Sequence, residues 1–307
     1  MKPDAFAAVM ATGIVSVAAY DHGYRLISVA LMLGAAVLLP VLVVAMLRTW
    51  RRDRWSLREI DVCFGLFTYV AACCVLATRL DEHRLAIFIL LPLAIQAWLS
   101  LTPPAVRALW RAGWTGLRDR AHGGWELASV ATSGLAMVFV AVGVLFWAVI
   151  LWTLALAMYL FLTGLVAWRW AHDRAERRVR DPDSWIVMGA PAIATLAGEH
   201  LHHALAPGPF ADGVRLVTIV TWVAATLWIP VLLALGLRRV DAWPAVFPLG
   251  MYSSATYAMA AETGWAALGV VSLGFCWIAF GAWLWTAVPA VGRVTGALGL
   301  SYGRGHG

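Results

Sequence analysis

Charged residues are scarce in this chain: of its 307 residues, only 13% are Asp, Glu, Lys or Arg. Hydrophobic residues make up 62%, which is more apolar surface than a single soluble core can hide. Most apolar runs approach the roughly 20 residues that a helix needs to cross about 30 Å of hydrocarbon. The composition excludes a soluble globular protein and predicts an integral membrane protein in contact with a lipid bilayer.

Cysteine is also rare, and the four residues Cys63, Cys73, Cys74 and Cys276 all lie inside apolar runs. This placement argues against a disulfide framework and a zinc site, and it is typical of small apolar side chains in a helical core. We expect no cofactor.

The net charge of +6 does not indicate a nucleic-acid partner, because the basic residues lie in short loops between apolar runs. Of the 23 Lys and Arg residues, only Arg25, Arg79, Arg84 and Arg215 fall on one side of a ten-span arrangement. The positive-inside rule then places both termini in the cytoplasm. We expect a multi-pass protein of the plasma (inner) membrane.

Apolar runs and their polar boundaries predict ten α-helical spans. They cover residues 4–20, 25–47, 61–78, 84–102, 124–141, 144–168, 184–204, 214–237, 242–262 and 265–291. Basic connections alternate with short turns, so the spans form five tandem helical hairpins. The hairpins repeat about every 60 residues, over 4–60, 61–122, 123–182, 183–240 and 241–295 of a single transmembrane domain, 1–307.

Odd and even spans differ in composition. The odd spans are short and rich in Gly, Ala, Ser and Thr, whereas the even spans are longer and dominated by Leu, Val, Ile and Trp. Small residues allow close helix packing, hydroxyls can face water, and bulky aliphatic residues suit lipid. For any one residue plain helix packing is the simpler explanation, but all five odd spans share the pattern. We therefore predict an inner ring of odd helices around a central pore and an outer ring of even helices.

The ninth span, residues 242–262, is the strongest candidate for a pore wall. Pro244 and Pro248 each remove a backbone donor and bend a helix, and Gly250 permits close approach of another backbone. Irregular helix at membrane depth is tolerated where it is buried in protein or lines a cavity. Phe247, directly before the second proline, is the bulky side chain expected to project into the pore.

Alignment of the repeat starts places Met10, Phe67, Ser129, Gly189 and Phe247 at one level. Phe247, Phe67 and Met10 are the candidate gate residues of a hydrophobic constriction. The predicted pore-lining residues are the small, hydroxylated or helix-breaking residues Thr12, Gly13, Ser16, Thr68, Ser129, Ser133, Gly189, Pro191, Pro248, Gly250 and Ser254. No Lys or Arg lies in the middle of a span, so anion selectivity would come from hydroxyls, exposed amides and helix N-termini.

A polar cluster ends the seventh span, where Glu199, His202 and His203 are weak candidates for a metal or proton-relay site. Glu199 and His203 are four residues apart and share a helix face. A polar helix end in an outer vestibule is the favoured interpretation, so no metal is expected.

The sequence resembles a known family over essentially the whole chain, and two segments carry the resemblance most clearly. They are Phe6–Ile14, FAAVMATGI, and the stretch from Asp241 to Tyr252, which contains VFPLGMY. Both resemble the tellurite-resistance/dicarboxylate transporter family, which includes the slow-type anion channels. The resemblance implies five hairpins around a pore, a homotrimer with one pore per subunit, and Phe247 as the residue that plugs the pore.

Three functions follow from these patterns. The first is a channel for small inorganic anions, gated by Phe247. The alternative is a proton-coupled transporter or exporter of C4-dicarboxylate, sulfite or tellurite. The third, a membrane metalloenzyme built on Glu199, His202 and His203, is disfavoured because no catalytic motif accompanies these residues. We expect that the protein is not an enzyme.

Overall fold

The computed structural model describes residues 2–53, 55–80, 83–172, 182–235 and 242–302. Within these ranges the chain is helical and has no strand. The α-helices are α1 (Ala7–Asp21), α2 (Arg25–Asp53), α3 (Ile60–Arg79), α4 (Arg84–Arg120), α5 (Leu127–Ala141), α6 (Leu145–His172), α7 (Ile186–Ala204), α8 (Pro209–Ala234), α9 (Trp243–Thr263) and α10 (Ala266–Tyr302). Two 3-10 helices, η1 (Gly123–Glu126) and η2 (Pro182–Trp185), lead into α5 and α7. The predicted all-α class is confirmed.

Several helix ends differ from the predicted spans. Helices α2, α4 and α10 run past residues 47, 102 and 291, and α8 begins at Pro209 and not at residue 214. Helix formation does not require apolar residues, so a helix continues past its apolar run, and proline is favoured in the first turn. Pro103 and Pro104 do not end α4, whose helical path is interrupted instead at Gly113, where φ is 62°.

Among the described residues, seven segments are long and apolar enough to cross a membrane: α2, α3, α4, η1 together with α5, α6, α8 and α10. Helix α1 is apolar but has only 15 residues. Helices α7 and α9 are longer but carry more polar residues, as in EHLHH near the end of α7. The multi-pass membrane class is therefore confirmed, and crossings by α1, α7 and α9 remain a prediction.

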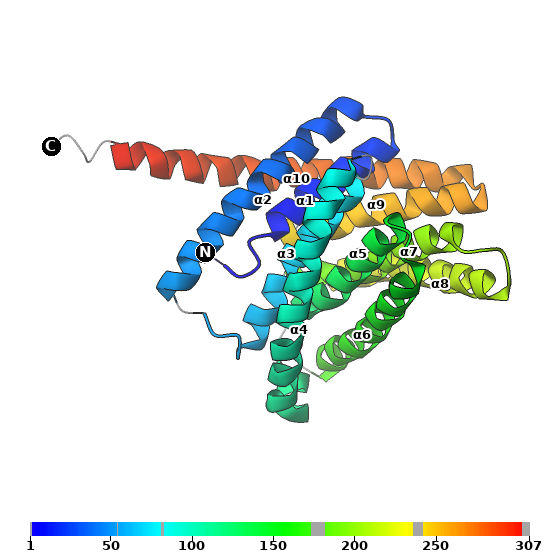
Figure 1. The fold of residues 1–307 in the computed structure, drawn as a ribbon, viewed down its shortest axis with the longest axis horizontal. Helices are drawn as coiled ribbons and strands as arrows, with labels where there is room; N and C mark the ends of the chain where they lie inside the picture. Colours follow the sequence, from blue (N-terminus) through cyan, green and yellow to red (C-terminus); the bar gives the residue numbers. More distant parts are fainter. Residues whose placement is uncertain (1, 54, 81–82, 173–181, 236–241, 303–307) are drawn as a thin grey trace.

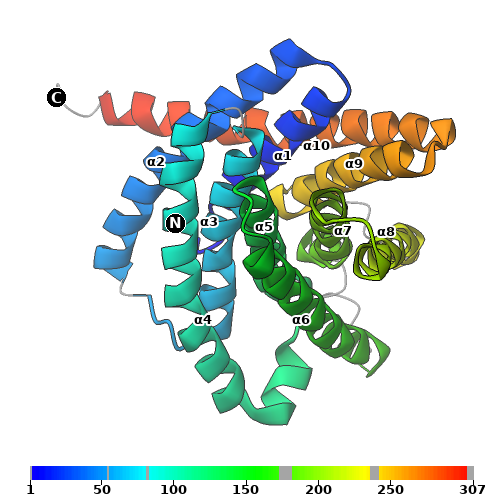
Figure 2. The ribbon, with the colours of Figure 1, turned by 45° about the vertical axis from the view of Figure 1, so that its right-hand side comes forward.

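The odd-numbered helices form a closed ring. Helices α1, α3, α5, α7 and α9 each contact the next, and α9 contacts α1. Each even-numbered helix packs on the odd-numbered helix before it and lies toward the outside (Figures 1 and 2). The apolar stretches of α3 and α5 are 89% and 83% buried, against 17–33% in the even-numbered helices. We call the two sets the inner and the outer helices.

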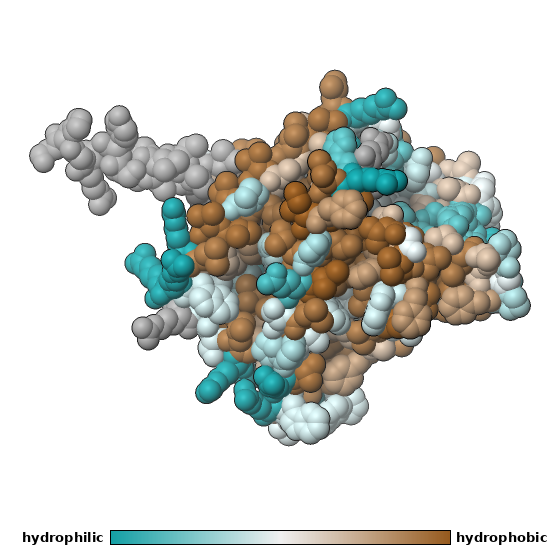
Figure 3. Space-filling model, viewed as in Figure 1, coloured by the Kyte–Doolittle hydropathy of each residue, from teal (hydrophilic) through white to brown (hydrophobic). Residues whose placement is uncertain are grey.

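The outer helices supply most of the exposed hydrophobic side chains. Figure 3 shows a broad hydrophobic surface over α2 and α4, with hydrophilic residues gathered mainly toward the edges of the molecule. A soluble monomer rarely exposes an apolar surface of this extent. Contact with lipid acyl chains is the environment that such a surface fits.

A glycine marks the close approach at every interface of the ring. A Cβ added at Gly13 or Gly134 would lie under 3.0 Å from the neighbouring helix, which real Cβ atoms essentially never do, and one at Gly189 or Gly250 would lie at 3.0 Å, which is tighter than nine in ten real Cβ contacts. The contacts are Gly13 to Val75 at 2.8 Å, Gly134 to Cys74 at 2.9 Å, Gly189 to Pro248 at 3.0 Å and Gly250 to Ile14 at 3.0 Å. At the fifth interface, Gly123 of η1 meets the backbone of η2. Small residues therefore set the radius of the inner ring.

Hydrogen bonds tie the inner ring to the outer helices. The hydroxyls of Ser16 and Ser28 donate to each other's carbonyl oxygens at 2.7 Å. Ser253 and Ser272 make the same reciprocal pair between α9 and α10. Indole N–H groups of the outer helices donate to inner-helix hydroxyls, from Trp98 to Thr132, Trp222 to Thr256 and Trp283 to Thr12. In an apolar surrounding these bonds satisfy groups that water cannot reach.

The contact between η1 and η2 gives a stability prediction. A Cβ at Gly123 would overlap the carbonyl oxygen of Asp183 and lie 2.8 Å from Cα of Ser184. Because backbone cannot move aside, we expect Gly123→Ala to cost at least about 1–3 kcal/mol, the usual range for overpacking. Thermal unfolding in detergent, followed by tryptophan fluorescence, should show a clear drop in Tm.

Gly34→Ala and Gly269→Ala are the matched controls, because nothing lies within 4 Å of a Cβ at either position. Their Tm should stay within error of the unsubstituted chain. An unchanged Tm for Gly123→Ala would contradict the close approach of η1 and η2.

Candidate functional site

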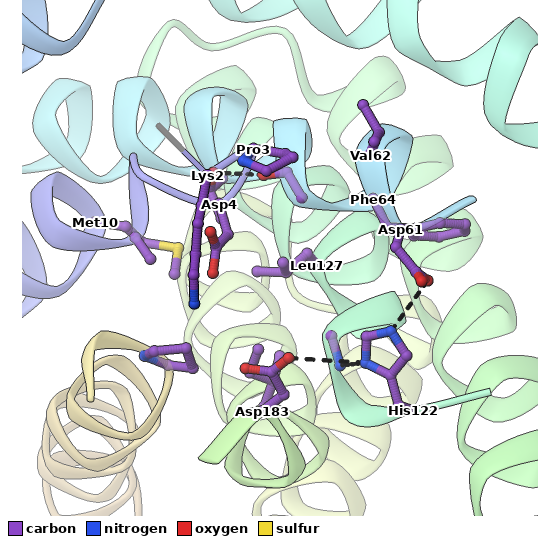
Figure 4. A pocket seen from close by; sticks show the side chains of 16 residues that line it. Lys2, Pro3, Asp4, Met10, Asp61, Val62, Phe64, His122, Leu127 and Asp183 are labelled. Atoms are coloured by element: carbon purple, nitrogen blue, oxygen red, sulfur yellow. Dashed lines mark hydrogen bonds and ion pairs between the residues drawn. The ribbon is translucent and has the colours of Figure 1, made fainter. Parts of the chain in front are cut away.

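The N-terminal ends of all five inner helices surround a cavity of about 210 Å³ (Figure 4). We call it the Asp61 cavity. Its lining includes Lys2, Asp4 and Met10 in and before α1, Asp61 and Thr68 of α3, Gly124 and Leu127 at the start of α5, Asp183 and Ile186 at the start of α7, and Pro244 of α9. One mouth of the ring is thus built near the starts of the five predicted repeats.

His122 joins two carboxylates in this cavity. The backbone N–H of Gly124 donates to its Nδ1 at 3.2 Å, so Nε2 carries the proton and donates to Asp61 Oδ1 at 3.1 Å. Trp125 Nε1 donates to the same oxygen at 3.0 Å. Asp183 Oδ2 lies 3.8 Å from Nδ1 (Figure 4). A second proton on His122 would therefore pair with Asp183.

The helix dipoles make this mouth favourable for negative charge. A helix N-terminus carries roughly half a positive charge, and five of them meet here. Asp61 lies in the first turn of α3 and Asp183 in η2 before α7, where carboxylates are stabilised by the same field. Lys2 adds a formal positive charge to the cavity wall. The helix N-termini favour negative charge at this mouth, and Asp4, Asp61 and Asp183 already place carboxylates in that field.

A second cavity, of about 290 Å³, lies at the C-terminal ends of α1, α3, α7 and α9. We call it the Arg79 cavity. Its charged lining residues are Asp21, Arg79, Glu199 and His200, and Ser254 and Tyr257 of α9 complete one wall. His200 Nδ1 lies 3.1 Å from Glu199 Oε2.

Apolar side chains occupy the axis between the two cavities. A gap of about 10 Å³, lined by residues that include Ile14, Val75 and Met251, shares Val17, Thr78 and Leu196 with the Arg79 cavity. The gap and the Asp61 cavity have no lining residue in common. The axis is therefore closed at the level between Met10 and Ile14 of α1.

Phe247 lies at this closed level. Along α9, Pro244 lines the Asp61 cavity, Met251 the small gap and Ser254 the Arg79 cavity. Phe247 lies between the first two, at the three- and four-residue spacing that keeps side chains on one helix face. Its side chain is fully buried. The opposite face of α9 contacts the outer helices, as Ser253 does.

The residues predicted to form one constriction have different surroundings. Met10 lines the Asp61 cavity. Phe67 lines none of the three cavities and packs against Phe64, with ring centroids 6.2 Å apart. Ser129 donates to the carbonyl oxygen of Ala155 on α6 at 2.9 Å and so faces away from the axis.

Most of the predicted pore-lining residues serve contacts between helices. Of that set, Thr68 and Ser254 line the large cavities. Thr12, Ser16 and Ser129 bond outer helices, so a pore-lining role for their hydroxyls is not supported. The six remaining residues of the set also line none of the three cavities and lie within helices of the ring: Gly13, Ser133, Gly189, Pro191, Pro248 and Gly250. Gly13, Gly189 and Gly250 make close contacts between helices, so plain helix packing accounts for these three glycines.

The weak metal candidates belong to an ion-pair network. His203 Nε2 lies 3.2 Å from Glu199 Oε1 and 3.5 Å from Glu262 Oε2, while His202 and Arg215 also face Glu262. No group of three or more His, Cys, Asp or Glu placed to hold a metal ion occurs in the described ranges. A metal site at Glu199, His202 and His203 is therefore not supported.

Sequence reasoning missed His122 and treated Arg79 only as a topology marker. His122 is 61 residues from Asp61 along the chain, and the two meet because α3 and η1 are neighbours in the ring. The acidic residues at several repeat starts could have predicted this cluster, because the repeat starts lie together at one end of a ring of parallel helices. The repeat start Asp241 lies outside the described residues.

Comparison with known proteins places these features in a family. A family model described as voltage-dependent anion channel (SLAC1) matches residues 1–291. Two Mycobacterium tuberculosis proteins, from strains CDC 1551 / Oshkosh and ATCC 25618 / H37Rv, are each named an uncharacterized membrane protein and are 30% identical to the chain over 140 residues. The aligned part covers 41% of this chain and 71% of each relative. The matched range, residues 1–291, contains all the residues that line both cavities and the small gap between them.

The rotation of α9 can be tested with two neighbouring serines. Ser254 lines the Arg79 cavity, whereas Ser253 donates to the carbonyl oxygen of Ser272 on α10 at 2.8 Å. We expect a water-soluble thiosulfonate reagent to modify Ser254→Cys much faster than Ser253→Cys, measured by mass spectrometry. The four native cysteines are buried, so the unsubstituted chain gives the baseline. Equal rates at the two positions would contradict the rotation.

Proposed function

This chain belongs to the SLAC1 family of voltage-dependent anion channels, and we propose that it conducts small inorganic anions along the axis of its inner ring. The observation that carries the proposal is the stack of two cavities separated by one apolar constriction. A path interrupted over a short distance needs only a local side-chain movement to become continuous. Hydrophobic constrictions of this kind gate by blocking passage and by dewetting.

We assign the gate to Phe247. It is the bulkiest side chain of the α9 face at the closed level, and Pro248 follows it directly. A proline inside a helix removes one backbone hydrogen bond and eases bending, so a small change at Pro248 would swing Phe247 off the axis. Met10, which lines the Asp61 cavity, and Phe67, which packs against Phe64, are the other two residues that we assign to the gate.

Selectivity for anions comes from the ends of the path. The five helix N-termini and Lys2 favour an anion in the Asp61 cavity, and none of the described residues that line the small gap between the cavities is Lys or Arg. Weak binding of this kind suits rapid passage, whereas tightly coupled transport more often uses a charged residue at the membrane centre.

The membrane arrangement is part of the same proposal. Ten crossings as five hairpins put both chain termini and the Asp61 cavity on the cytoplasmic side of the plasma membrane, which the distribution of basic residues supports. The Arg79 cavity then faces the outside. A homotrimer with one path per subunit is an expectation from the family resemblance.

Proton-coupled transport of a dicarboxylate, sulfite or tellurite species is the second candidate. It is favoured by one observation: a carboxylate–histidine pair lies in each cavity, Asp61 with His122 and Glu199 with His200. Proton uptake that accompanies substrate uptake into proteoliposomes, and that is lost in Glu199→Gln, would support coupling. Anion flux without proton movement would exclude it.

Replacement of Phe247 tests the gate. We expect Phe247→Ala to raise anion conductance in planar bilayers by about tenfold or more, because removal of a barrier of about 1.4 kcal/mol already changes a rate tenfold. Phe146→Ala is the control, since Phe146 is 70% exposed on the outer helix α6. Equal conductance of Phe247→Ala and the unsubstituted chain, at equal protein incorporation, would contradict the gate assignment.

A further inference from the structure

We propose that the C-terminal part of α4 binds the headgroups of anionic phospholipids through Val106, Arg107, Trp110 and Arg111. We call these four residues the α4 lipid surface. Two features carry the proposal: the residues continue the lipid-facing side of α4, and their positive charge has no acidic partner. The proposal rests on α4 crossing the membrane, and it holds whether or not the inner ring conducts anions.

One side of α4 is exposed along its whole length before Gly113. The exposed residues recur every three or four positions, at Leu85, Phe88, Pro92, Gln96, Leu99 and Pro103. Val106 and Trp110 follow at the same spacing, and Arg107 and Arg111 lie beside them. Buried residues such as Ala105 and Ala108 lie between them on the opposite side. The α4 lipid surface is therefore part of the same side that meets the acyl chains higher up.

The length of the helix places this surface at the edge of the bilayer. At 1.5 Å per residue, the stretch from Arg84 to Pro103 covers about 30 Å, the thickness of the hydrocarbon core. Arg107 and Trp110 follow about one to two turns later, and their side chains lean toward the helix N-terminus and thus back toward the bilayer. In Figure 3 hydrophilic residues gather at the lower edge of the molecule, where α4 ends.

The surface ends at a break in the helix. At Gly113, where φ is 62°, the helical path is interrupted and the chain turns back toward α6 (Figure 2). There Arg169 of α6 donates to the carbonyl oxygen of Ala121 at 2.7 Å. The segment after the break is thus held by α6, and the residues before it remain on the lipid-facing side.

The charge of the surface is not neutralised by the protein. Asp119 is the only acidic residue from Arg84 to Arg120, and its carboxylate accepts from Arg118 Nε at 2.7 Å. Within the described ranges no carboxylate forms an ion pair with Arg107 or Arg111, and both side chains are exposed. An arginine fork fits two oxygens of a phosphate group. Two such forks one turn apart complement a negatively charged headgroup.

The apolar members of the surface indicate a lipid and not a soluble phosphate. Trp110 is 85% exposed and Val106 is 52% exposed, between and beside the two arginines. An indole is favoured at headgroup level, where its ring contacts the glycerol and upper acyl region and its N–H faces polar groups. A zwitterionic headgroup adds a cation that opposes the arginines, so an anionic lipid fits best.

Native mass spectrometry of the full chain in detergent tests the proposal, with phosphatidylglycerol and phosphatidylcholine of identical acyl chains added in turn. We expect phosphatidylglycerol to bind more tightly. Because each arginine near the membrane surface attracts anionic lipid, Arg107→Gln/Arg111→Gln should weaken phosphatidylglycerol binding about tenfold and phosphatidylcholine binding by less than about twofold. The preference should shrink in high salt, where charge is screened. Arg107→Lys/Arg111→Lys should keep most of it, since the charge remains.

Arg25→Gln/Arg84→Gln is the matched control, because it removes two exposed charges from helix starts on the other side of the membrane. It should leave both affinities unchanged. Unchanged phosphatidylglycerol binding in Arg107→Gln/Arg111→Gln, or an equal loss in the two double variants, would overturn the proposal. A changed oligomeric state of Arg107→Gln/Arg111→Gln in the same spectra would also overturn it, since the surface would then be a contact between copies of this chain. Lipid binding is read without any anion current, so failure of the proposed function would leave these results intact.

Discussion

Close approach at glycine is the constraint on which the rest of the structure depends. Each interface of the inner ring has a glycine where an added Cβ would overlap or crowd the neighbouring element. Because these contacts draw five helices together, the axis is narrow enough for single side chains to close it. The same closeness brings five helix N-termini to one mouth and four C-termini to the other. Helix packing thus determines both the closed apolar level of the axis and the opposite partial charges of the helix ends at its two mouths.

The polar side chains have two roles: some hydrogen-bond neighbouring helices, and others line the two cavities. In the middle of the molecule, hydroxyls and indoles bond the inner ring to the outer helices and leave the axis apolar. At the mouths, Asp61, Asp183, Asp21 and Glu199 lie in the cavities with histidine or arginine nearby. An apolar centre between charged ends is typical of a path that recruits ions electrostatically and controls them sterically.

Much of the fold could be predicted from the sequence, because apolar periodicity and polar boundaries determine where membrane helices lie. The helix order was as expected and most boundaries were within a turn, whereas the direction in which Phe247 faces stays a prediction. The direction of the hydroxyls was not predictable. A serine in a helix of small residues can face a neighbouring helix or the axis, and partners such as Ser28 for Ser16 are known only once the helices are placed. The cluster of Asp61, His122 and Asp183 was missed for the same reason, since its members come from separate repeats.

The reversal potential of purified protein in a planar bilayer, under a tenfold potassium chloride gradient, tests the central claim most directly. It should be measured with Phe247 present and with Phe247 replaced by alanine. The account predicts a reversal potential close to the chloride equilibrium potential in both cases. Reversal near the potassium potential, or no current from either protein, would contradict it.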